Sequence, residues 1–191
     1  MISLPDHDWL MRSLWIAFAL VWAAGALMAD RTVRGPPRAQ YWPHLVVMIC
    51  GVALMVNGFG AVRFLHLQLW PGITLFPLGF VLTTLGLAIA IWARIHLGRY
   101  WSAAVGSKAE HRLIESGPYA RLRHPIYSGI ALAVLGSAIA DGAVHAMLGA
   151  AILVAAMVAK SRSEEEWLSQ EFGPAYGAYR ARSWALVPFI Y

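Results

Sequence analysis

The chain has 191 residues, of which 59% are hydrophobic and only 13% are charged. This composition excludes an ordinary soluble protein, and several apolar runs approach the ~20 residues that a helix needs to cross a bilayer. The net charge of +5 does not favour nucleic-acid binding, because the basic residues lie in loops beside the apolar runs rather than in one patch. The single cysteine, Cys50, provides neither an internal disulfide nor a metal-binding cluster. We therefore predict an all-α, polytopic integral membrane protein.

The apolar runs predict a bundle of about five transmembrane helices within one domain, residues 1–191. Residues 1–97 contain the first three helices, which we expect at 9–29, 43–64 and 73–97. The first helix does not resemble a signal peptide, because its apolar run is too long and it lacks a basic start. Proline and glycine mark the loops between the three helices.

The second part of the domain, residues 98–191, contains a helical hairpin and a polar tail. The two hairpin helices, expected at 126–140 and 143–159 around the turn Asp141-Gly142, are each shorter than ~20 residues. They either cross a thin region or enter the membrane and return, and in both cases the chain ends on the side that it left. The polar segment 99–124 and the tail are therefore expected on one face.

The tail, residues 161–191, is expected to continue the fifth helix, to break at Gly173-Pro174 and to resume as a helix through Tyr176 and Tyr179. Thirteen of the fifteen lysines and arginines lie in the loop after the first helix, around the polar segment and in the tail. All of these regions face the same side of a five-helix bundle. By the positive-inside rule this side is cytoplasmic, in the inner or plasma membrane.

The polar segment ends in Arg123-His124-Pro125-Ile126-Tyr127, directly before the fourth helix. Proline is well tolerated in the first turn of a helix, so His124 is expected at the N-cap, with its ring along the free backbone amides. An anionic group is favoured there, and Tyr127 on the same turn can stack on a flat ring. The alternative is a helix cap with interfacial aromatic residues and no ligand.

Other polar groups lie on both sides of the hairpin. Gly117-Pro118-Tyr119 is a turn that presents an aromatic ring for a ligand or as an interfacial anchor, and residues 111–114 form a strand-like stretch or a connector. Lys160 and Glu164 are four residues apart and share a helix face, whereas Arg162 points elsewhere. They are either a solvated helix end or a cation for an anionic acceptor beside a carboxylate for an ammonium or sulfonium ligand.

Taken in order, these pieces resemble the isoprenylcysteine carboxyl methyltransferase family and the related phospholipid methyltransferases. The resemblance covers roughly residue 97 to the C-terminus, half of the chain. It is carried by His111-Arg-Leu-Ile114, Gly117-Pro-Tyr119, Arg123-His-Pro-Ile-Tyr-Ser-Gly129, Glu164-Glu-Glu-Trp-Leu168, Phe172-Gly-Pro-Ala-Tyr176, Tyr179 and Pro188-Phe-Ile190.

The resemblance implies an S-adenosyl-L-methionine-dependent integral membrane methyltransferase with a cytosolic cofactor pocket. The residues that it implies for the cofactor are His111, Arg112, Leu113, Ile114, Tyr119, His124, Pro125, Ile126, Tyr127 and Glu164. Lys160 and Arg162 are the residues implied for the acceptor. Lys160 stands where the family has an arginine, and lysine is a point charge without the two-pronged guanidinium. No catalytic residue and no metal site is assigned.

The predicted reaction is methyl transfer to a small lipophilic acceptor that enters from the membrane, such as a carboxylate of the prenylcysteine type. A phospholipid or thiol acceptor is the alternative within the class. From other classes, a sterol-type reductase that uses NADPH and a non-enzymatic membrane scaffold are the rivals; the short chain argues against the reductase. The expected partners are membrane lipids and the lipophilic substrate, without nucleic acid, and the sequence predicts no oligomeric state.

Overall fold

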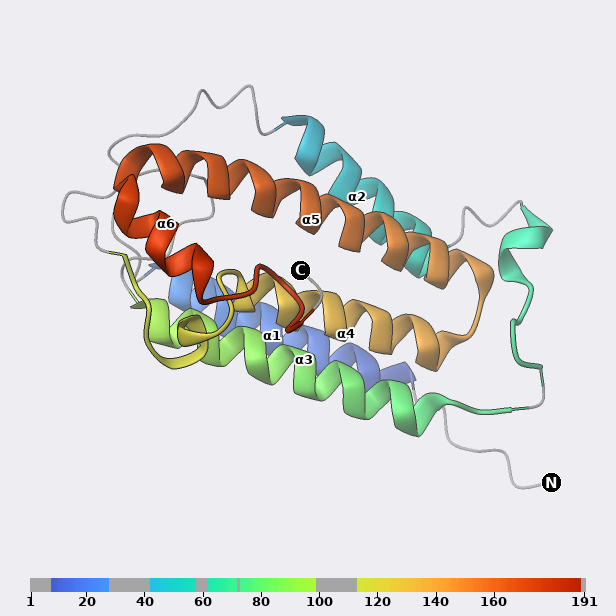
Figure 1. Cartoon of the computed structure of the whole chain (residues 1–191). Coiled ribbons are helices and arrows are strands. Elements are labelled where there is room, and N and C mark those ends of the chain that lie inside the picture. The colour runs from blue at the N-terminus through green and yellow to red at the C-terminus, as the bar shows by residue number, and fades with distance from the viewer. Residues whose placement is uncertain (1–7, 28–41, 58–61, 72, 99–112, 190–191) are drawn as a thin grey trace.

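The computed structural model describes residues 8–27, 42–57, 62–71, 73–98 and 113–189 (Figure 1). Within these residues the fold is helical, with two isolated β-bridges and no strand. The α-helices are α1 (Asp8–Leu27), α2 (Trp42–Asn57), α3 (Phe76–Leu97), α4 (Pro125–Asp141), α5 (Val144–Phe172) and α6 (Pro174–Ala181). Two short 3₁₀ helices, η2 (Arg63–His66) and η4 (Gly117–Ala120), lie in the connections.

Three of the helices, α1, α3 and α5, are long and apolar enough to cross a membrane. The other two apolar helices are shorter, with 16 residues in α2 and 17 in α4. Large apolar side chains on the outer faces of α1, α2 and α3 are exposed, as expected for helices that face lipid. The predicted all-α membrane fold is therefore confirmed.

Helices α3 and α4 pack closely because glycines line their contact. A Cβ at Gly86 would lie 2.5 Å from the Gly129 carbonyl oxygen, and one at Gly136 would lie 2.6 Å from the Thr83 nitrogen. Small residues at such spacing let two helix backbones approach. The Thr83 hydroxyl then reaches across the contact and donates to the Ala133 carbonyl at 3.1 Å.

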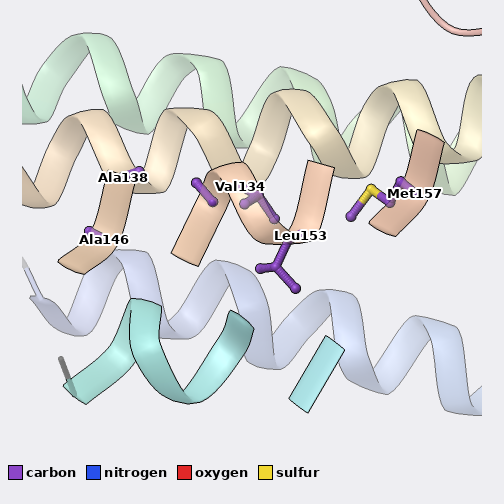
Figure 2. Packing of buried hydrophobic residues seen from close by; sticks show 6 residues of the cluster. Val134, Ala138, Ala146, Leu153 and Met157 are labelled. Carbon is purple, nitrogen blue, oxygen red and sulfur yellow. The ribbon is translucent and has the colours of Figure 1, made fainter. Parts of the chain in front are cut away.

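Helix α5 packs on its two sides against α4 and α2 (Figure 1). The buried cluster between α4 and α5 consists of Val134, Ala138, Ala146, Ala150, Leu153 and Met157 (Figure 2). Leu153 also approaches Gly51 of α2, where a Cβ would lie 2.9 Å from its side chain. Helix α1 lies against α3, and the Arg94 side chain donates to the Gly25 carbonyl.

Two helix boundaries differ from the sequence-based expectation. Helix α2 (Trp42–Asn57) does not extend to residue 64 as predicted, because Arg63–His66 form the separate 3₁₀ helix η2. Helix α3 begins at Phe76 rather than at residue 73, because Pro77 suits a first turn. As predicted, helix α5 continues without a break through its polar part, so it has 29 residues, and α4 is short.

Local signals placed the other boundaries correctly. Helix α4 ends at Asp141 before Gly142, which adopts a left-handed conformation (φ 78°). Helix α5 ends before Gly173 (φ 51°), and α6 starts at Pro174. The described part of the polar segment, residues 113–124, shares one end of the bundle with the tail, because Leu122 forms a parallel β-bridge with Trp184. We call this end, where α4 begins and the polar part of α5 lies, the site end.

Candidate functional site

The start of α4 is held by the C-terminal tail. The backbone N–H of Arg123 donates to the Trp184 carbonyl at 2.8 Å, and that of His124 donates to the Ala185 carbonyl at 3.0 Å. One turn later, the Ser128 hydroxyl donates to the Leu186 carbonyl at 2.5 Å. These bonds satisfy backbone groups at a helix start and fix the direction of the two side chains that precede Pro125.

His124 is the N-cap residue of α4, as predicted, but its side chain makes no capping hydrogen bond. The prediction that its ring lies along the free amides of the first turn is therefore wrong. The ring instead points at α5, with Nδ1 3.5 Å from Glu164 Oε2 and Nε2 3.4 Å from Glu165 Oε1. Two carboxylates attract an imidazole more strongly than backbone amides do, since an imidazolium pairs with opposite charge.

Tyr127 and Glu164 meet across the contact between α4 and α5. The Tyr127 hydroxyl donates to Glu164 Oε1 at 2.6 Å, and its ring stacks on His124 with centroids 5.7 Å apart. The Lys160 ammonium lies 5.7 Å from the centroid of the same tyrosine ring. One aromatic ring is thus bordered by a carboxylate, an imidazole and an ammonium, from the two consecutive helices of the hairpin.

A second carboxylate, Glu165, ties three elements together. Arg123 Nε donates to its Oε1 at 2.7 Å, and Arg180 Nε of α6 lies 3.7 Å from Oε2. The other end of the Arg123 guanidinium donates to the Ser183 and Arg180 carbonyls. Glu165 and Arg123 are both largely buried, so the main role of this pair is to hold these elements together.

Burial and charge act in opposite directions on His124. Burial lowers the pKa of the imidazole, but hydrogen bonding to Glu164 and Glu165 and their negative charge outweigh it, so the pKa is raised above its usual value of 6.5. The imidazolium form is therefore favoured in the folded protein.

An apolar layer lies beneath the polar groups. Tyr119, Ile126 and Ala93 form a buried cluster against which Ile114 and Tyr127 pack. Tyr119 is fixed at both ends, since its hydroxyl donates to the Ala93 carbonyl at 3.4 Å and its own carbonyl accepts from Tyr179 at 2.6 Å. Burial raises the pKa of the Tyr179 hydroxyl to about 12, so it remains a neutral donor.

The structure gathers most, but not all, of the predicted site residues. His124, Pro125, Tyr127, Glu164 and Lys160 surround one polar centre, and Ile114, Tyr119 and Ile126 lie in the apolar layer below it. Leu113 is half-buried and Arg162 is exposed. His111 and Arg112 lie outside the described residues. The cofactor and acceptor roles of all of these residues stay predictions.

Two residues of the site were missed in the prediction, Arg123 and Glu165. Both stand next to a predicted site residue in the sequence, and their opposite charges were the available signal. The sequence does not show that they pair across the bundle or that the tail covers them. Within the described residues, no group of three His, Cys, Asp or Glu side chains is placed to hold a metal ion.

Comparison with known proteins assigns the fold and the family. Residues 74–175, more than half of the chain, match the sequence model of phospholipid methyltransferases. The chain belongs to the phospholipid methyltransferase family. The matched residues run from α3 into α6 and include every described residue of the polar centre.

Two relatives of this family member are similar over about 60% of the chain. The protein-S-isoprenylcysteine O-methyltransferase of Schizosaccharomyces pombe is 32% identical over 116 residues, 59% of this chain and 48% of that enzyme. The cobalt-zinc-cadmium resistance protein CzcN of Cupriavidus metallidurans is 32% identical over 125 residues, 62% of this chain and 53% of that protein. The chain therefore matches about half the length of each relative.

A solved structure shares the whole fold of the chain. It is that of the eukaryotic intramembrane Ras methyltransferase ICMT, isoprenylcysteine carboxyl methyltransferase, with a TM-score of 0.56 and 20% sequence identity. The similarity covers 100% of this chain and 70% of that one. The predicted resemblance to this family is confirmed.

Proposed function

We propose that this protein transfers a methyl group from S-adenosyl-L-methionine to a small lipophilic acceptor that carries a carboxylate, such as a compound of the prenylcysteine type. The observation that carries the proposal is the meeting of Tyr127, Glu164 and Lys160 at the site end, from two helices. An aromatic ring between a carboxylate and an ammonium suits a ligand that is both cationic and anionic.

The chemistry of these residues fits the cofactor. Glu164 is the group for an ammonium or sulfonium, and the stacked rings of Tyr127 and His124 are the surface for a flat base. His124 Nε2 is buried and makes no well-aligned hydrogen bond, so in the imidazolium form it can donate to a polar ligand atom. S-adenosyl-L-methionine, when bound, supplies an already activated sulfonium methyl group.

The chain then has to orient the acceptor and exclude water. A carboxylate acceptor is ionised at neutral pH and needs no general base, whereas a thiol or amine would need one. Glu165 is a poor base, because Arg123 and Arg180 hold its two oxygens. This arrangement favours the carboxylate acceptor over the alternatives of the class.

We further propose that the site end faces the cytoplasm. The positive-inside rule supports this orientation, since the described basic residues of the polar segment and the tail, such as Arg123 and Arg180, lie at this end. The soluble cofactor would enter from the cytosol, and the acceptor from the lipid between helices.

Binding of S-adenosylhomocysteine to the purified protein tests the cofactor site. We expect Glu164→Ala to weaken this binding by about tenfold or more, since a charged hydrogen bond is worth about 1.5–3 kcal/mol. Glu166→Ala is the matched control, because Glu166 is an exposed carboxylate on the same helix. Equal affinity of wild type and Glu164→Ala would reject the assignment. Methyl transfer from labelled cofactor into a membrane lipid extract would then identify the acceptor.

A further inference from the structure

His44 lies in the first turn of α2, outside the residues that match the family. Its partner on α5 follows from the register of the two helices. They run antiparallel, because Gly51 approaches Leu153 and Met55 approaches Gly149, four residues further along one helix and four residues back along the other. Two helical turns in the opposite direction place His44 across from Lys160.

The side-chain electrostatics agree with this register. The half-buried imidazole of His44 interacts with the charges of both Lys160 and Glu164. Helix α2 therefore contributes a polar side chain to the site end, next to the groups from α4 and α5. The Lys160 ammonium, whose charge acts on His44, also lies 5.7 Å from the centroid of the Tyr127 ring.

The two helices are closest at the far end of their contact. There Gly51 and Gly149 allow backbone approach, since a Cβ at Gly149 would lie 2.6 Å from the Met55 nitrogen. In Figure 1 the first turn of α2 lies farther from α5 than its last turn does. At the site end the register places the polar residues His44 and Lys160 across from each other, rather than glycines.

We infer that His44 and Lys160 together bind the anionic end of the acceptor, a carboxylate on a lipophilic chain. This inference rests on the proposed function and names two residues that recognise its substrate. A carboxylate has two oxygens, and a lysine ammonium attracts them as one point charge without a directed donor for each oxygen. An imidazole N–H donates in either protonation state, so His44 supplies the second directed donor.

The surroundings suit an amphiphile. Leu45, Val46 and Val47 follow His44 and are exposed, as lipid-facing side chains are, so the apolar chain of the acceptor can stay in the bilayer. The negative charge of Glu164 does not prevent an anion from binding here, because Tyr127 and His124 engage that carboxylate from the other side.

Binding of a matched pair of probes tests the inference. N-acetyl-S-farnesylcysteine carries the carboxylate, and its carboxamide is isosteric but uncharged. With S-adenosylhomocysteine present, we expect the wild type to prefer the acid by about tenfold, the value of one charged hydrogen bond. His44→Ala should lose most of this preference by weakening the acid alone, while His44→Gln, which keeps an N–H donor, should retain part of it.

His66→Ala is the matched control, because His66 is exposed and contacts His145, fifteen residues before Lys160 on α5 and so about 22 Å along the helix. Full acid preference in His44→Ala, or none in the wild type, would overturn the inference. Unchanged binding of S-adenosylhomocysteine shows that the variant is folded.

Failure of the two proposals can be told apart. If the wild type transfers no methyl group but its acid preference depends on His44, the anion site stands and the proposed reaction falls. If the wild type methylates the probe and His44→Ala has the same KM and kcat, the reaction stands and the role of His44 is wrong. If KM rises in His44→Ala while kcat is kept, both stand.

Discussion

His124 shows how much one residue depends on its surroundings. Its position before Pro125 makes it the N-cap of α4, yet its ring turns away from the helix start to two carboxylates of α5. The backbone bond to Ala185 holds it in this direction. The residue is thus at once a helix boundary and the link between the polar segment and the tail.

The raised pKa of His124 predicts a pH dependence of stability. Because the folded protein favours the imidazolium, its contribution is complete below pH 6.5 and is lost as the pH rises through the folded-state pKa. We expect the thermal unfolding midpoint to fall as the pH is raised above 6.5, and to fall less in His124→Asn. His66→Asn should follow the wild type. The same slope in wild type and His124→Asn would contradict the prediction.

The pair of Arg123 and Glu165 predicts a charge effect that a double variant can isolate. Arg123→Met leaves a buried carboxylate with only His124 and the more exposed Arg180 beside it, which should cost about 3 kcal/mol of unfolding free energy. Arg123→Met combined with Glu165→Gln should recover most of this loss, because the buried charge is gone. Unfolding in a denaturing detergent measures the unfolding free energy of the single and the double variant. If the effects of the two substitutions simply add, the charges do not form a buried pair.

At the scale of the helices, small residues decide which faces meet. Gly79, Gly86, Gly129 and Gly136 bring α3 and α4 together, and Gly51 and Gly149 do the same for α2 and α5. In lipid the hydrophobic effect does not favour one apolar helix face over another, so close packing determines which helices become neighbours. The position of Glu164 beside Tyr127 follows from these contacts.

Gly129→Ala should therefore destabilise the fold. The new Cβ would lie 2.5 Å from the Gly86 carbonyl oxygen and 2.6 Å from the Ala90 nitrogen, and backbone atoms cannot move aside cheaply. We expect a loss of about 2 kcal/mol of unfolding free energy, typical of overpacking. Gly177→Ala in α6 is the control, since no atom lies near its Cβ and alanine favours a helix. Equal stability of Gly129→Ala and wild type would show that the helices can shift apart.

At the scale of the whole molecule, the site exists because both ends of the hairpin return to one face. Helices α4 and α5 form that hairpin, and the tail after α6 closes back over the start of α4 (Figure 1). Glu164, Glu165, His124 and Arg180 therefore gather at one end of the bundle.

Cysteine labelling tests which side this is. In a Cys50→Ser background, Glu171→Cys at the site end should react with a membrane-impermeant maleimide only after the cells are permeabilised. Arg63→Cys at the opposite end should react in intact cells. Both native side chains are exposed, so access to water is not the limiting factor. The reverse pattern would place the site end outside and reject the positive-inside assignment.

The sequence by itself determined the elements and their order. The apolar runs predict helices because they favour transfer into lipid, and Pro125, Gly142 and Gly173-Pro174 predict helix ends and turns because they restrict the local backbone. These signals, and the shared face that follows from them, need no knowledge of which residues are neighbours in space. The ordered polar pieces also predicted the family. The extent of α2 was overestimated, because the largely apolar sequence continues to residue 64, where the structure has the 3₁₀ helix η2.

Only the tertiary structure decided which side chains meet. The direction of the His124 ring, the pairing of Arg123 with Glu165, the bond of the tail to α4 and the placement of His44 across from Lys160 all join residues far apart in the chain. Such contacts depend on how closely the backbones approach and on which charged groups become buried and therefore need a partner. Neither quantity is a property of a local stretch of sequence.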